Sequence, residues 1–137
     1  MNKVLSVIIA LLGVLFLLIG LRWQVDPSAA AATLGMPLLD GAGRSTQIGD
    51  MTAFFLTLGV VILMGLVTAQ RIWFYPACML LGIAAAGRIL AWAVHGAAFA
   101  VDMIAVEVII TGFLLFASRR LAIHNSPSPR ETDTAPR

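Results

Sequence analysis

Residues 4–21 read VLSVIIALLGVLFLLIGL, an apolar run of 18 residues without a charged side chain. A helix needs about 20 mostly apolar residues to cross a hydrocarbon core of roughly 30 Å, so this run is long enough for one membrane span. It is longer than the roughly 7–15 apolar residues of a signal peptide, and RWQVDP follows it instead of small residues. We therefore expect a retained membrane helix here.

The rest of the chain has the same apolar character. Its 137 residues are 60% hydrophobic and only 12% charged, whereas about 25% of the residues in a soluble domain are charged. Three further apolar runs of span length occupy residues 51–70, 72–94 and 97–118. The sequence predicts an all-α integral membrane protein, with an up-down four-helix bundle in residues 1–120. The basic residues form no patch, which argues against a nucleic-acid partner and leaves the lipid bilayer as the expected environment.

Two segments lie outside the predicted spans. Residues 22–50 are expected to form one external loop. Within it, Asp26 and Pro27 predict the start of a short helix that ends at Gly35, and GMPLLDGAGRSTQIGD at 35–50 predicts a turn-rich return. Residues 121–137 are rich in Pro, Ser and Thr without an apolar face, as is typical of a disordered tail.

The basic residues predict how the bundle is threaded. With four spans, both ends of the chain share one side of the membrane, and the basic residues expected there are Lys3, Arg71, Arg119 and Arg120. The opposite side holds Arg22 and Arg44, in a loop that also carries three aspartates. Because cytoplasmic segments carry the excess of Lys and Arg, we expect both termini, and the C-terminal tail, in the cytoplasm.

Four ionisable residues fall within residues 87–107, GRILAWAVHGAAFAVDMIAVE. If the last two spans turn near Gly96, Arg88 lies at the depth of residue 105 on the neighbouring helix, between Asp102 and Glu107. Either carboxylate is within reach of the arginine. Charged residues at such depth are costly, and they face a partner or a cavity.

These residues define a candidate ligand site. Arg88, Trp92 and His95 share a stripe at i, i+4 and i+7, Asp50 begins a polar stripe on the second span, and Arg44 lies on a loop expected to fold over the same mouth. The candidate ligand-binding residues are Arg88, Glu107, Trp92, His95, Arg44 and Asp50. Two interpretations stay open: a buried ion pair that only fixes helix packing, or a pocket with a polar base.

Other kinds of site find little support. Cys78 is the single cysteine, so the chain has no internal disulfide, and His95 and His124 are expected on opposite sides of the membrane, where they cannot share a metal ion. No motif identifies a cofactor, which stays unknown. Glycines at 13, 20, 59 and 65 are predicted to mark close helix packing.

A family resemblance rests on GRSTQIGDMTAFFLTLG (43–59), YPACMLLG (75–82), GRILAWAVHG (87–96) and the later glutamate. These strings resemble a group of small bacterial four-helix membrane proteins that are distantly similar to the DoxX-like proteins. The resemblance implies an up-down four-helix bundle in a bacterial inner membrane and implies no reaction. Some DoxX-like members are linked to quinone or thiol oxidation, but the single Cys78 offers no dithiol.

The expected function is to hold a lipophilic or amphipathic small molecule in the outer half of the bundle. One alternative is an accessory or structural membrane subunit whose ion pair only specifies packing. Another is an enzyme of the isomerase or oxidoreductase type on a lipid-like substrate, with Glu107 as base and Arg88 as electrophilic stabiliser. A homodimer or a second membrane protein stays open as a partner.

Overall fold

The computed structural model describes residues 3–124 and confirms the predicted all-α fold. Five α-helices and one 3₁₀ turn make up this part of the chain: α1 (Lys3–Val25), α2 (Pro27–Thr33), α3 (Gly41–Thr68), η1 (Arg71–Trp73), α4 (Phe74–His95) and α5 (Val101–His124). Four of the helices are long and apolar enough to cross a membrane, as in a multi-pass membrane protein. The first residues of the predicted tail, 121–124, continue α5 instead. The rest of the predicted tail, residues 125–137, lies outside the described residues.

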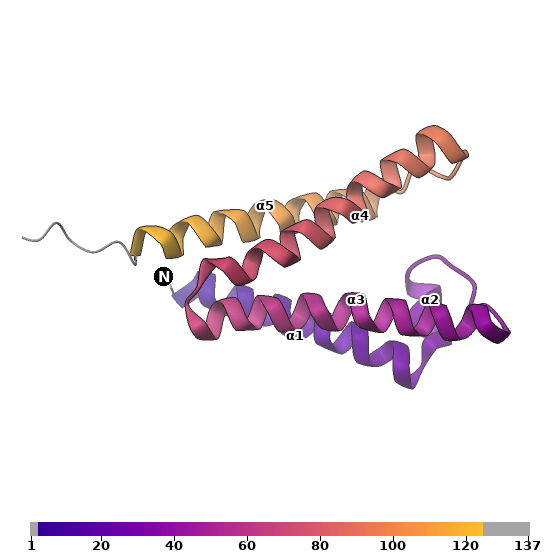
Figure 1. Ribbon diagram of the computed structural model, residues 1–137, viewed down its shortest axis with the longest axis horizontal. Helices are drawn as coiled ribbons and strands as arrows, with labels where there is room; N and C mark the ends of the chain where they lie inside the picture. The colour runs from indigo at the N-terminus through magenta and orange to yellow at the C-terminus, as the bar shows by residue number, and fades with distance from the viewer. Residues whose placement is uncertain (1–2, 125–137) are drawn as a thin grey trace, which may run out of the picture.

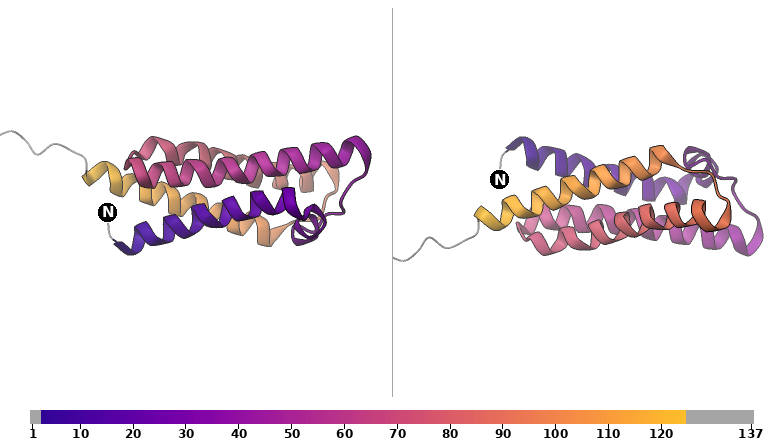
Figure 2. Two further views of the ribbon diagram at one scale, coloured as in Figure 1. Left: turned by 90° about the horizontal axis from the view of Figure 1, so that it is seen from below. Right: turned by 90° about the horizontal axis from the view of Figure 1, so that it is seen from above.

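The long helices associate as two antiparallel pairs. Helix α1 packs along α3, and α4 packs along α5 (Figure 1). The pairs approach each other at the end that holds the start of α1, the α3–α4 connection and the end of α5, and they diverge toward α2 and the α4–α5 connection (Figures 1 and 2). We call these the converged end and the α2 end.

Glycines bring α1 and α3 close together, as predicted. A Cβ atom on Gly59 would lie 2.6 Å from Leu17 and 2.8 Å from the carbonyl oxygen of Gly13. A Cβ on Gly20 would lie 2.7 Å from Leu56. The bare backbones therefore leave room for leucine side chains of the partner helix, which increases the dispersion contacts that hold membrane helices together.

The converged end contains the main core. Phe74, at the start of α4, is fully buried. Its ring packs so closely on Gly65 of α3 that a Cβ atom added to this glycine would lie only 2.7 Å from the ring atom Cε1. Ile9, Ile62 and Leu114 are also fully buried in this cluster, so all four long helices contribute to it. This packing joins the two pairs at one end and leaves the α2 end to other contacts.

The short helix α2 forms as the sequence predicts. The Asp26 side chain accepts a hydrogen bond from the Ala29 N–H at 3.1 Å, and Pro27 occupies the first turn, where no backbone N–H donor is needed. The helix ends before Gly35, which adopts φ +69°. Ala30 and Ala31 pack against the fully buried Trp23 of α1, so α2 is fixed to the α1/α3 pair.

The expected turn-rich return at residues 35–50 is wrong over residues 41–50, which form the first turns of α3. With 28 residues, α3 is about 42 Å long, so its first turns can project beyond a hydrocarbon core of roughly 30 Å. Polar side chains secure the entry: Gln47 accepts the Leu39 N–H at 3.0 Å and donates to the Pro37 carbonyl at 3.1 Å. Helix α1 likewise continues to Val25, which shortens the predicted loop from both sides.

Charge is distributed unevenly between the two ends. Lys3, Arg71, Arg119 and Arg120 lie at the converged end. The acidic residues of the described chain, Asp26, Asp40, Asp50, Asp102 and Glu107, all belong to the half toward the α2 end. The same half also holds Arg22, Arg44 and Arg88, so within residues 3–124 its five acids and three bases give a formal charge of −2, against +4 for the four basic residues at the converged end.

Candidate functional site

The α4/α5 pair carries an ion pair inside the apolar region. The Nε atom of Arg88 donates a hydrogen bond to Oε1 of Glu107 at 3.0 Å. Gly96 makes this register possible: it ends α4 with φ +66°, and five residues (96–100) lead into α5. The sequence placed Arg88 within reach of both Asp102 and Glu107. In the structure Arg88 bonds to Glu107, whereas Asp102 is exposed near the start of α5.

The ion pair leaves hydrogen-bonding groups unused. The Glu107 side chain is only 9% exposed, yet within residues 3–124 nothing donates a hydrogen bond to its buried Oε2 atom. Thr111 is close by, but its hydroxyl donates to the backbone carbonyl of Glu107 at 2.7 Å and not to the carboxylate. Arg88 bonds through Nε, which leaves its terminal amino groups free to donate elsewhere. A buried carboxylate oxygen without a donor is costly, so this atom marks an incomplete site.

A cavity lies beside the ion pair. Its volume is about 440 Å³, within the range of about 300–1,000 Å³ that is typical of small-molecule sites. Arg88 and Glu107 form part of its wall, together with Asp102 near its α5 rim. Residues from α1, α2 and α3 line the opposite side, so the cavity occupies the space where the two helix pairs diverge.

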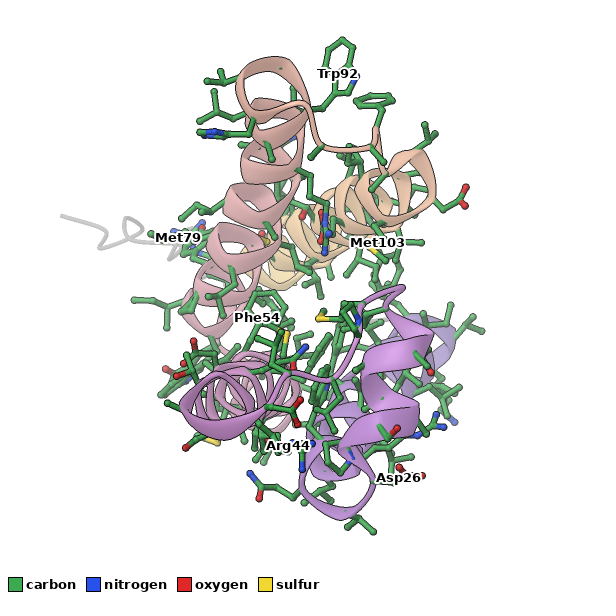
Figure 3. All side chains as sticks on the ribbon, turned by 90° about the vertical axis from the view of Figure 1, so that its right-hand side faces the viewer. Asp26, Arg44, Phe54, Met79, Trp92 and Met103 are labelled. Carbon is green, nitrogen blue, oxygen red and sulfur yellow. The ribbon has the colours of Figure 1, made fainter. Side chains whose placement is uncertain are left out.

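Most of the cavity wall is apolar. Phe54 of α3 and Met103 of α5 lie on facing sides of the gap when the molecule is viewed from its α2 end (Figure 3). Phe55 contacts Phe54 edge to face, with ring centroids 5.2 Å apart, and stacks on Phe16 at 6.2 Å. Leu34, which caps the end of α2, also contributes to the wall. The wall of the cavity is thus mainly aromatic and aliphatic, with a polar region at the ion pair.

The predicted stripe on α4 does not extend into this cavity. Trp92 is 51% exposed and packs against Phe99 of the α4–α5 connection, with ring centroids 5.0 Å apart. Figure 3 places it at the far side of α4, away from the gap. His95 is exposed at the last position of α4. Arg88 lines the cavity because its long side chain reaches Glu107. Trp92 and His95 lie further along α4, closer to the α4–α5 connection than the ion pair is.

The two residues predicted on the loop and the second span also lie elsewhere. Arg44 donates to Asp40 and to the Leu39 carbonyl, both at 2.8 Å, and so stabilises the start of α3. Asp50 is exposed on α3. Neither residue lines the cavity, because residues 41–50 continue a helix away from it instead of folding back over the mouth. Of the six candidates, the structure brings only Arg88 and Glu107 together at the cavity.

Sequence reasoning missed several wall residues. Met103 and Val106 follow the same helix as Glu107, and an i−4 relation from Glu107 would have indicated Met103. No comparable signal indicated Thr33 and Leu34, since their position depends on how α2 folds onto the α1/α3 pair. In the described part of the chain, no three His, Cys, Asp or Glu residues lie close enough to hold a metal ion.

No family model, curated protein or solved structure matches the chain. The resemblance to DoxX-like proteins therefore stays a prediction, and the function is argued from the geometry of the cavity.

Proposed function

We propose that this multi-pass protein resides in a bacterial inner membrane with both termini in the cytoplasm, and that it binds a lipophilic or amphipathic small molecule between its two helix pairs. The observation that carries the proposal is the Oε2 atom of Glu107, which is buried and has no donor in residues 3–124, on a side chain that lines a mostly apolar cavity of about 440 Å³. A rotation of the carboxylate would present this atom to a polar group on a bound molecule, which would supply the missing hydrogen bond.

The rest of the wall suits an apolar body. Phe54, Met103 and Ile110 offer aromatic and aliphatic surface directly beside the ion pair. An ion pair that served packing alone would be expected to satisfy both carboxylate oxygens, because a half-satisfied polar network inside a protein is costly. The incomplete pair favours binding over a purely structural role.

Thermal stability tests this proposal. A lipophile at about 100 times its dissociation constant adds about 2.7 kcal/mol to the stability of the protein it binds, which is visible as a raised melting temperature in detergent. We expect alkyl chains with polar head groups to stabilise the wild type. Met103→Trp, which fills the cavity with a larger side chain, and Arg88→Met, which removes the polar base, should lose most of this shift.

Equal stabilisation of the wild type and both variants would mean that lipophiles act only through the detergent micelle. The accessory-subunit interpretation, in which the ion pair specifies packing, would then be the better account.

The proposed orientation rests on the four basic residues at the converged end, against two, Arg22 and Arg44, at the α2 end. Reporter fusions after Ser118 should be active in the cytoplasm, and fusions within α2 near Ala31 should report the exterior. A cytoplasmic signal from the Ala31 fusion would invert the orientation and place the cavity in the inner half of the membrane.

A further inference from the structure

The charges and the free hydrogen-bonding groups of the cavity wall restrict the chemistry of the ligand's head group more than the volume of the cavity does. The charged residues at the wall are one base, Arg88, and two acids, Asp102 and Glu107, which gives a formal charge of −1. Arg88 is already neutralised by Glu107 at 3.0 Å. An anionic head would therefore find no uncompensated positive charge at the wall, and the exposed Asp102 would add a weak repulsion.

The free hydrogen-bonding groups favour a head that both donates and accepts. Oε2 of Glu107 lacks a donor, and the terminal amino groups of Arg88, on a side chain that is 38% exposed, can donate to an acceptor. A carboxylate or a fully ionised phosphate accepts but does not donate, and an ammonium group donates but does not accept. A hydroxyl group carries one donor and two acceptor lone pairs, so it can satisfy both residues at once without adding charge.

We propose that the ligand of this cavity is a neutral amphiphile with a hydroxyl head, in which the O–H donates to Oε2 of Glu107 and the oxygen accepts from Arg88. Long-chain alcohols and other lipids with a free hydroxyl belong to this class. The inference rests on the proposed function, because it assumes that the cavity binds a lipophile.

A head-group series on one alkyl chain tests the assignment. Hexadecanol, hexadecyl methyl ether, hexadecyl phosphate and hexadecylamine share their chain and differ only in what the head donates, accepts and carries as charge. Apparent affinities come from the melting temperature of the full-length protein at increasing ligand concentration, with Met103→Trp as the control for uptake into the micelle. We expect hexadecanol to bind about tenfold more tightly than its methyl ether, because the ether loses a hydrogen bond to a charged group.

Glu107→Gln provides the matched variant. It keeps the shape of the side chain but leaves Arg88 without a counter-charge, so the preference should move from hexadecanol to hexadecyl phosphate. Should this variant fail to fold, the wild-type series still decides, since the phosphate and the amine are expected to bind at least about tenfold more weakly than the alcohol.

Two outcomes overturn different statements. If the wild type binds the ether as tightly as the alcohol, or binds the phosphate or the amine more tightly, the hydroxyl assignment is wrong while lipophile binding stands. If none of the four compounds stabilises the wild type beyond Met103→Trp, the proposed function fails and the head-group assignment fails with it.

Discussion

The α1/α3 pair buries Gly13, Gly20 and Gly59 against leucine side chains, so closely that an added Cβ would lie within 3 Å of its neighbours. In the α4/α5 pair, added Cβ atoms on Gly82, Gly87 and Gly112 would meet nothing within 4 Å. Instead, the Arg88–Glu107 bond joins these helices in the half toward the α2 end. Steric fit fixes the α1/α3 pair along its length. Near the α2 end, the α4/α5 pair depends instead on the Arg88–Glu107 bond, which leaves Oε2 of Glu107 without a donor in residues 3–124. The candidate site lies at the less constrained pair.

Arg88→Ala should produce the largest effect. It leaves the buried Glu107 carboxylate without a counter-charge, and breaking a buried pair costs about 3–5 kcal/mol; because the Arg88 side chain is 38% exposed, we expect a loss at the lower end of this range. Unfolding in detergent, followed by circular dichroism, would measure the loss. Asp102→Ala is the control, because this exposed acid in the first turn of α5 contributes only about 0.3–1 kcal/mol through the helix dipole.

Exchanging the two charges, with Arg88→Glu and Glu107→Arg in one chain, should recover part of the stability lost in each single variant. If the double variant is no more stable than the single ones, the polar bond does not hold the α4/α5 pair, and the contrast between the pairs disappears.

Gly59→Ala should destabilise the α1/α3 pair by about 1–3 kcal/mol, the range for overpacking a tight interface. The new Cβ would lie 2.8 Å from the backbone oxygen of Gly13, and a backbone atom cannot move aside as the end of a side chain can. Thermal unfolding in the same detergent measures the change. A variant as stable as the wild type would show that α1 and α3 can slide apart at little cost.

Gly82→Ala should have the smallest effect. Its Cβ would enter open space, and alanine is favoured over glycine in a helix by up to about 1 kcal/mol, so stability should stay unchanged or rise slightly. The same unfolding assay applies. A loss as large as that of Gly59→Ala would indicate that this face of α4 is covered in solution, by a second copy of the chain or by another membrane protein.

Much of the fold could be predicted because span length and apolar composition are local properties. The apolar runs, the capped helix after Asp26 and the turn at Gly96 each appear directly in the sequence. The glycines of the α1/α3 interface were also recognisable as sites of close approach. The first turns of α3 were missed because Gly, Ser and Asp favour turns in isolation, whereas here the helix is secured by Gln47 and by the Arg44–Asp40 pair.

The candidate site was predictable only in part. Helix depth brought Arg88 near two acids, but the rotation of α5 decides which acid faces it, and rotation depends on packing across the whole pair. The divergence of the two pairs was not predictable either, since it depends on contacts between residues far apart in the sequence: Phe74 joins the core at the converged end, whereas α2 packs on the α1/α3 pair. Trp92 and His95 share a face with Arg88, but helical periodicity does not indicate how deep a cavity extends.

The burial of Trp23 has an optical consequence. Trp23 is fully buried in a cluster that includes Ile19, Leu34 and Phe55, and each of these three residues also lines the cavity. Of the other tryptophans, Trp92 faces away from the gap and Trp73 lies at the converged end. A molecule entering the cavity therefore comes within one layer of side chains of a single indole. The fluorescence of Trp23 would report occupancy of the cavity without any label. A ligand whose alkyl chain carries bromine atoms would quench Trp23 more strongly than Trp73 and Trp92.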